Sequence, residues 1–117
     1  MNVQFAKNGK LTVVTVSGRI DSAGAASFRE SLAPHLDECV ATSAGLVLNL
    51  AGVDYVSSAG LRELLIAAKK IASGKGRMVV CCLQPLVAEV VRISRFDLVL
   101  SLAETEAQAR QMLDPAA

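Results

Sequence analysis

Runs of hydrophobic residues alternate along the chain with segments of helical period, and this pattern predicts strands followed by helices. Five short runs combine β-branched and other apolar residues in the way that is typical of strands. These runs lie at residues 3–6, 11–16, 45–50, 77–83 and 98–100. A turn signal at residues 7–10 separates the first two runs, so we expect them to form a hairpin.

Four segments repeat apolar residues at the three- or four-residue spacing of an amphipathic helix. The first begins near Ser22, the second covers residues 59–72, the third begins at Pro85, and the last is capped by Ser101 or Thr105 and ends at Leu113. The positions expected to face the core are Phe28, Leu32 and Leu36 in the first helix, Leu61, Leu64, Leu65, Ala68, Ile71 and Ala72 in the second, and Val87, Val90, Val91 and Ile93 in the third. The side chains expected to lie away from the core in the second helix are Arg62, Glu63, Lys69 and Lys70. Residues 114–117 are expected to fray.

These elements predict a single α/β domain over residues 1–117. Each strand–helix–strand step after the hairpin should cross over with a right hand and run parallel. We therefore expect a mixed sheet of four to five strands, with an N-terminal hairpin, parallel βαβ units and about four helices packed against it. The composition agrees, because 52% of the residues are hydrophobic and only 3% are aromatic. Val, Leu, Ile and Ala are then left to build a core between layers.

Charge and hydropathy narrow the class of protein. Twelve basic and eleven acidic side chains give a net charge of +1, and no charge run exceeds two residues, which argues against a nucleic-acid partner. No apolar run approaches the roughly 18–20 residues that span a bilayer, and the N-terminus lacks the pattern of a secretion signal. The sequence therefore favours a soluble, cytoplasmic protein without a membrane span.

The cysteines and the histidine do not suggest a metal site. Cys39, Cys81 and Cys82 are odd in number, and two are adjacent, so a disulfide framework is not expected. Thiolate or imidazole partners at ligand spacing are lacking, and the three side chains are interpreted as small core residues. His35 is the single histidine, and it is expected on a helix surface or an interface.

Two adjacent hydroxyls, Ser57 and Ser58, lie between a predicted buried strand and the helix of residues 59–72. They lack the Gly-x-Ser-x-Gly elbow of a hydrolase, and nothing in the sequence places His35 beside them as a base, so an enzyme is not expected. A helix N-terminus does favour negative charge, so it could hold a phosphate attached to either serine. Gly60 would let another protein approach closely. The alternative on physical grounds is a capped helix without a regulatory role.

A family resemblance bears on this choice. Residues 46–65, which read LVLNLAGVDYVSSAGLRELL, resemble the signature of STAS domains, and most of all that of the stand-alone bacterial anti-sigma factor antagonists. Residues 16–21 are similar to the family's segment before its first helix, and residues 93–99 to its approach to the last strand. The resemblance implies a non-enzymatic protein that binds an anti-sigma factor with serine-kinase activity. That kinase would phosphorylate the chain and release it, and a serine phosphatase would restore binding; the chain itself would need no cofactor.

The resemblance also implies which residues act. Ser58 corresponds to the phosphorylated serine, with Ser57 as the alternative acceptor. The implied partner-binding residues are Asp21, Ser57, Ser58, Ala59, Gly60 and Arg62. Asp21 has a second interpretation as the N-cap of the first helix.

The sequence departs from the family's best-known pattern. Ser57 stands where an acidic residue is usual, Ala59 where a second hydroxyl often follows, and Asn49 where Asp is frequent. A second possible role, within the same fold, is that of a non-enzymatic subunit of a lipid-transport or stress-sensing complex without a phosphorylation cycle.

Overall fold

A mixed sheet of five strands forms the centre of the molecule in the computed structural model, which describes residues 1–113. The strands are β1 (Asn2–Asn8), β2 (Leu11–Ile20), β3 (Leu46–Val56), β4 (Met78–Cys81) and β5 (Ser101–Ala103). The helices are α1 (Ala25–Thr42), α2 (Ser58–Ser73), α3 (Pro85–Ile93), the 3₁₀ helix η1 (Phe96–Leu98) and α4 (Glu106–Leu113). The expected class, an α/β domain with an N-terminal hairpin and four α-helices, is confirmed.

The strands lie in the sheet in the order of the sequence, β1-β2-β3-β4-β5. β1 and β2 pair antiparallel through a tight turn in which Gly9 adopts a φ of 65°. Glycine adopts that left-handed conformation without the steric cost that a side chain brings. The three remaining pairings are parallel, and each is connected through a helix. The parallel strands therefore bring their carboxyl ends to one edge of the sheet.

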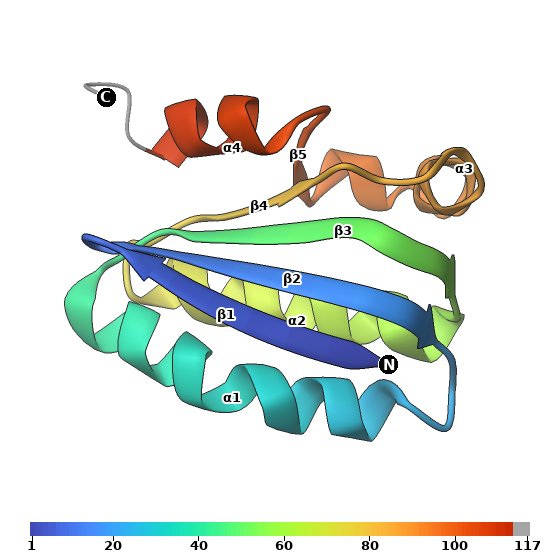
Figure 1. The fold of residues 1–117 in the computed structure, drawn as a ribbon, viewed down its shortest axis with the longest axis horizontal. Helices are drawn as coiled ribbons and strands as arrows, with labels where there is room; N and C mark the ends of the chain where they lie inside the picture. The colour runs from blue at the N-terminus through green and yellow to red at the C-terminus, as the bar shows by residue number, and fades with distance from the viewer. Residues whose placement is uncertain (114–117) are drawn as a thin grey trace.

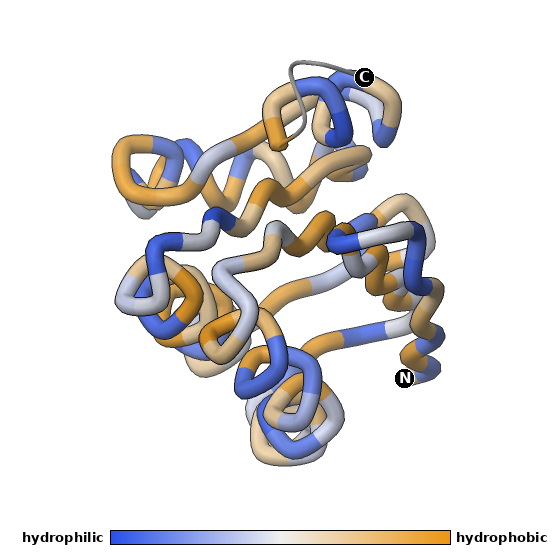
Figure 2. The backbone as a smooth tube through the Cα atoms, turned by 90° about the vertical axis from the view of Figure 1, so that its left-hand side faces the viewer, coloured by the Kyte–Doolittle hydropathy of each residue, from blue (hydrophilic) through white to orange (hydrophobic). Residues whose placement is uncertain are grey.

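Helices cover both faces of the sheet, as Figure 1 shows. α1 and α2 lie side by side on one face, and the larger core forms there. α4 lies on the opposite face, where Ala109 packs with Val13, Val47, Val79 and Cys81. The same layers are visible from the side in Figure 2. Because β3 and β4 are buried between two helical layers, their sequences are apolar over successive residues.

All five strands differ from their predicted bounds, β1 and β4 by one to two residues at each end. β2 continues to Ile20 rather than ending at residue 16. β3 continues to Val56 rather than ending at residue 50, because its second half pairs with the end of β2 through irregular register. The last strand is not residues 98–100, as expected. Residues Phe96–Leu98 form the 3₁₀ helix, and Ser101–Ala103 pair with β4. The sequence did not indicate which three residues would pair with β4, because strand pairing depends on tertiary contacts.

The predicted helices need smaller corrections. α1 begins at Ala25, not near Ser22, although its expected core positions are buried. Ile93 is the one expected core position of α3 that is wrong, since 68% of its surface is exposed. At α4 the amide nitrogen of Gln108 donates to the Thr105 hydroxyl at 3.1 Å, so Thr105 and not Ser101 caps this helix. Residues 114–117, expected to fray, lie outside the described residues.

Among the residues that the structure describes, none belongs to a helix long and apolar enough to cross a membrane.

Candidate functional site

The candidate site forms where β2 and β3 end together at the carboxyl edge of the sheet. Ile20 and Val56, the last residues of these strands, lie opposite each other in the parallel ladder. One residue further on, the amide nitrogen of Ser57 donates a hydrogen bond to the carbonyl oxygen of Ile20 at 2.8 Å. This bond fixes the start of α2 against the segment that leads to Asp21. Strand pairing thus brings together two predicted site segments that are more than 30 residues apart in sequence.

Ser57 is the N-cap of α2. Its backbone is extended, with φ −79° and ψ 170°, and its side-chain oxygen accepts a hydrogen bond from the Gly60 amide at 3.1 Å. The Ser57 carbonyl accepts the first helical bond, from Leu61, at 2.9 Å. Only 7% of the Ser57 surface is exposed. The hydroxyl of this residue is therefore buried and occupied in holding the helix end.

Ser58 is the first residue of α2, and it is exposed to solvent. The backbone N–H groups of a first turn carry partial positive charge, which stabilises an anion placed there. The structure assigns the capping role to Ser57. An accessible hydroxyl at the mouth of a helix is then left at Ser58.

Gly60 is required by close packing and not only by its position in a turn. An added Cβ would lie 2.8 Å from Ile20 Cγ2, 2.9 Å from the Ile20 carbonyl oxygen and 3.0 Å from Val56 Cγ1. Carbon contacts this short are repulsive, so a larger residue would push α2 away from the ends of both strands. Gly60 is buried, and its lack of a side chain lets the first turn of α2 pack closely against the ends of β2 and β3. Ala59 beside it is half-buried.

Asp21 is not the N-cap of α1, which is one of its two expected roles. The cap is Gly24, whose amide nitrogen donates to the Asp21 carboxylate (Oδ1) at 2.7 Å. Asp21 instead closes the turn between β2 and α1 and remains half-buried. Its position directly after Ile20 places it next to the Ser57 backbone bond.

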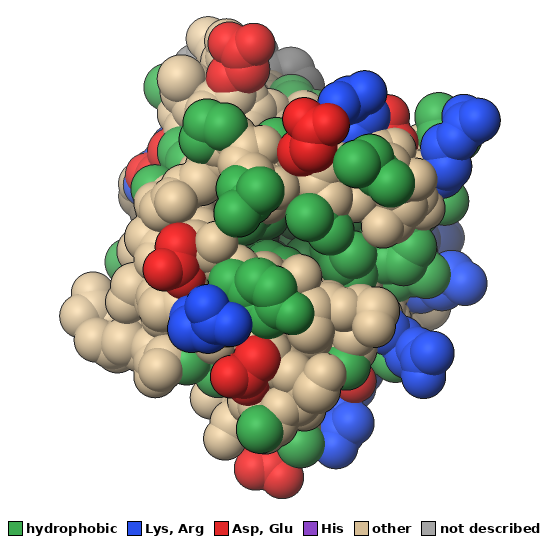
Figure 3. All heavy atoms as spheres, turned by 90° about the vertical axis from the view of Figure 1, so that its right-hand side faces the viewer, with side chains coloured by type: hydrophobic (Ala, Val, Ile, Leu, Met, Phe, Trp, Pro, Cys, Tyr) green, Lys and Arg blue, Asp and Glu red, His purple; other side chains and the backbone are tan. Residues whose placement is uncertain are grey.

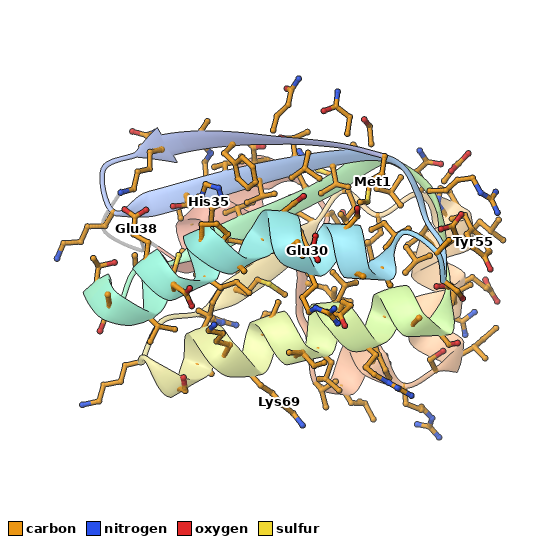
Figure 4. All side chains as sticks on the ribbon, turned by 90° about the horizontal axis from the view of Figure 1, so that it is seen from below. Met1, Glu30, His35, Glu38, Tyr55 and Lys69 are labelled. Atoms are coloured by element: carbon orange, nitrogen blue, oxygen red, sulfur yellow. The ribbon has the colours of Figure 1, made fainter. Side chains whose placement is uncertain are left out.

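Sequence reasoning missed an aromatic–cation pair at this edge. The guanidinium carbon of Arg19 lies 4.3 Å from the centre of the Tyr55 ring. The two residues face each other in the β2–β3 register, one step before Ile20 and Val56. Figure 4 shows Tyr55 at the end of the sheet, beside the start of α2. No signal in the sequence indicated this pair, because both residues lie beyond the predicted strand ends at residues 16 and 50 and the register was not known.

The exposed side of α2 differs from the prediction at one acidic residue. Arg62 and Lys69 are exposed as expected, and Lys69 extends from α2 away from α1 (Figure 4). Glu63, expected on that side too, is only 8% exposed, and its carboxylate lies 3.3 Å from the Arg29 guanidinium of α1. The pair spans the contact between α1 and α2, which explains how a charge is tolerated there. Ile66, 46% exposed, was not singled out by the sequence.

Among the residues that the structure describes, groups that could support catalysis or metal binding do not gather around Ser58. His35 stacks on Phe5 of the hairpin, with ring centres 3.5 Å apart. All three cysteines are free thiols. Burial, and secondarily the neighbouring Cys82, raises the pKa of Cys81 to about 12. Over residues 1–113, no cluster of three His, Cys, Asp or Glu side chains could hold a metal ion.

Comparison with known proteins agrees with this arrangement. Residues 2–109 match the model of the STAS domain. The chain is 33% identical to a Bordetella bronchiseptica protein described provisionally as the anti-sigma factor antagonist BtrV, over 93% of this chain and 91% of that protein.

Solved structures show the same fold. An anti-sigma factor antagonist from Mycobacterium paratuberculosis superposes with a TM-score of 0.81 at 24% identity, over 96% of this chain and 92% of that one. The anti-sigma factor antagonist SpoIIAA, unphosphorylated, superposes with a TM-score of 0.77 at 16% identity, over 99% of both chains. SpoIIAA of Bacillus in its phosphorylated form gives 0.66 at 17%, over 95% and 98%. Because the family model matches almost the whole length of this chain, the chain belongs to the STAS domain family.

Proposed function

We propose that this chain is an anti-sigma factor antagonist that works by partner switching. Unphosphorylated, it binds an anti-sigma factor that is also a serine kinase, through the surface around Ser58. The kinase phosphorylates Ser58 and the complex dissociates, and a serine phosphatase restores the binding form. The proposal rests on one observation about two adjacent hydroxyls. The Ser57 hydroxyl is buried in the helix cap, whereas Ser58 is exposed.

Accessibility favours Ser58 over Ser57 as the acceptor. In phosphoryl transfer the Ser58 oxygen forms a bond to the γ-phosphorus of ATP, the bond to the β-phosphate oxygen breaks, and ADP leaves. The hydroxyl proton passes to a base of the kinase. That geometry needs an oxygen that the kinase can reach in line with the leaving group. Ser57 could offer its oxygen only after breaking the bond from Gly60 and leaving its buried position.

A phosphate on Ser58 is compatible with the fold and disruptive to an interface. It adds about two negative charges in the favourable field of the α2 N-terminus. A partner that covers this hydroxyl in the unphosphorylated form would then have to bury those charges or be repelled by them. The switch therefore needs no refolding of the domain, only a change of charge on a preformed surface.

The comparisons support the proposal at the level of the family. A similar protein carries the description of an anti-sigma factor antagonist, and SpoIIAA, which shares the fold, has been solved both with and without a phosphate. In the proposed cycle the chain is a substrate and not an enzyme. ATP and magnesium belong to the kinase, and the reaction takes place in the cytoplasm.

Mapping the phosphate tests the acceptor assignment. The chain is incubated with a purified serine-kinase anti-sigma factor encoded near its own gene and with ATP, and the phosphorylated peptide is identified by mass spectrometry. We expect phosphate on Ser58 in the wild type and in Ser57→Ala, and none in Ser58→Ala. Phosphate elsewhere, or none, would contradict the proposal. Stable co-purification with a transporter ATPase instead would favour the second possible role.

A further inference from the structure

The outer side of α3 exposes large hydrophobic residues. Leu86 and Ile93 are 65% and 68% exposed. They are seven residues apart, two helical turns, so they lie on one side of the helix. Val90, half-buried, lies between them and packs partly against the core. We call these three residues the α3 apolar surface. Exposed apolar side chains that gather on one face are candidates for a contact with another molecule.

The α3 apolar surface belongs to the same face of the molecule as Ser58. α3 follows β4, and its N-cap residue Gln84 donates to the carbonyl oxygen of Ala51 in β3 at 2.8 Å. α3 therefore starts beside the carboxyl half of β3, which leads on to Tyr55 and Ser58. In Figure 1, α3 and the start of α2 lie at the same end of the molecule.

Figure 3 views this end directly. Hydrophobic side chains gather across its centre and upper part, around a hollow, and charged side chains are scattered among them. Tyr55 adds to the apolar area with 38% of its surface exposed. Exposed hydrophobic side chains therefore lie at the same end of the molecule as the start of α2.

The charges of α3 itself do not favour a polyanionic ligand. Glu89 and Arg92 pair with each other at 2.7 Å, so they leave no net charge on the outer side of α3. A surface without excess positive charge has little attraction for nucleic acid or an anionic membrane. Its chemistry fits an apolar patch on another protein, with polar groups at the rim.

We infer that the α3 apolar surface is a second docking site for the same anti-sigma factor kinase that acts on Ser58. The inference rests on the proposed function and extends it. The kinase contacts α3 through hydrophobic side chains and the start of α2 through groups that sense charge. Phosphorylation opposes only the second contact, so the α3 contact contributes affinity in both states of Ser58.

Exposed residues allow the inference to be tested without disturbing the fold. Leu86→Ser and Ile93→Ser remove apolar surface, and Leu98→Ser is the matched control, an even more exposed leucine (71%) on η1, outside the α3 apolar surface. The affinity of each variant for the purified kinase is measured without ATP by calorimetry. ATP is then added, and phosphate on Ser58 is followed by mass spectrometry.

We expect the double variant Leu86→Ser/Ile93→Ser to bind about tenfold or more weakly, and Leu98→Ser to bind like the wild type. Equal affinity of all variants would overturn the inference while leaving the proposed function intact. Weaker binding of the double variant without phosphate on Ser58 in any sample would support the docking site and contradict the proposed function. Self-association of the wild type that the double variant abolishes, with unchanged kinase binding, would overturn the inference by identifying a second copy of the chain as the occupant.

Discussion

The amide nitrogen of Ser57 lies 2.8 Å from the carbonyl oxygen of Ile20, and this hydrogen bond connects the ends of two parallel strands to the first turn of α2. The bond gives Ser57 a structural role with both its backbone and its side chain. Ser58, next in the chain, is left exposed at the first turn of α2. A modification of Ser58 therefore changes the molecular surface without breaking the hydrogen bonds that Ser57 makes.

Removing the cap should cost stability and leave the modification site in place. Ser57→Ala loses the hydrogen bond from Gly60, and we expect the free energy of unfolding to fall by about 1 kcal/mol. Ser58→Ala is the control, with an expected change within about 0.5 kcal/mol. Urea unfolding followed by circular dichroism measures both. A larger loss in Ser58→Ala than in Ser57→Ala would reverse the roles given to the two serines.

Filling the space at Gly60 should separate α2 from the strand ends. The methyl group of Gly60→Ala would lie within 3.0 Å of three atoms of Ile20 and Val56, and such overpacking costs about 1–3 kcal/mol. Arg62→Ala, on the exposed side of the same helix, should change stability by less than about 0.5 kcal/mol. The same unfolding assay compares them. A Gly60→Ala protein as stable as the wild type would show that the first turn is not tightly packed.

The ion pair between α1 and α2 should be needed mainly to neutralise a buried carboxylate. Arg29→Ala leaves Glu63 buried without its partner, and we expect a loss of about 1 kcal/mol, near the low end for a buried group because Arg29 is itself 56% exposed. In Arg29→Ala/Glu63→Leu both charges are gone, so most of the stability should return. If the double variant is less stable than Arg29→Ala, the carboxylate has another stabilising contact.

Stability should fall as the pH is lowered through the titration of His35. Burial, and secondarily the charge of Lys7, lowers the pKa of His35 from its ordinary value of 6.5. The unfolded chain then binds a proton before the folded one does. The contribution is fully present above about pH 6.5 and is lost as the pH falls through the lowered pKa. Unfolding free energies measured across this interval should decline in the wild type and decline less in His35→Gln. If the unfolding free energy depends on pH equally in the wild type and in His35→Gln, the titrating group is not His35.

The sequence predicted the parts of this molecule that depend on local pattern. The serine before a run of helical period marked the start of α2, and Phe28, Leu32 and Leu36 were correctly expected in the core. Both features follow from capping and from helical period, which operate within a few residues.

What the sequence did not predict depends on contacts between distant segments. Glu63 is buried because α1 packs there and brings Arg29. Arg19 and Tyr55 meet because of an irregular register between β2 and β3. Ile93 continues the apolar pattern of α3, yet no described element covers it. An apolar residue left outside the core by the fold is consistent with a contact that another molecule supplies.

The central claim is that the charge on Ser58 controls partner binding. Its most direct test compares the affinity of the purified kinase, without ATP, for the unphosphorylated chain and for the chain phosphorylated on Ser58. The account predicts that phosphorylation weakens binding about tenfold or more, with the Ser58→Ala chain binding like the unphosphorylated wild type. Equal affinities for the two forms would contradict it.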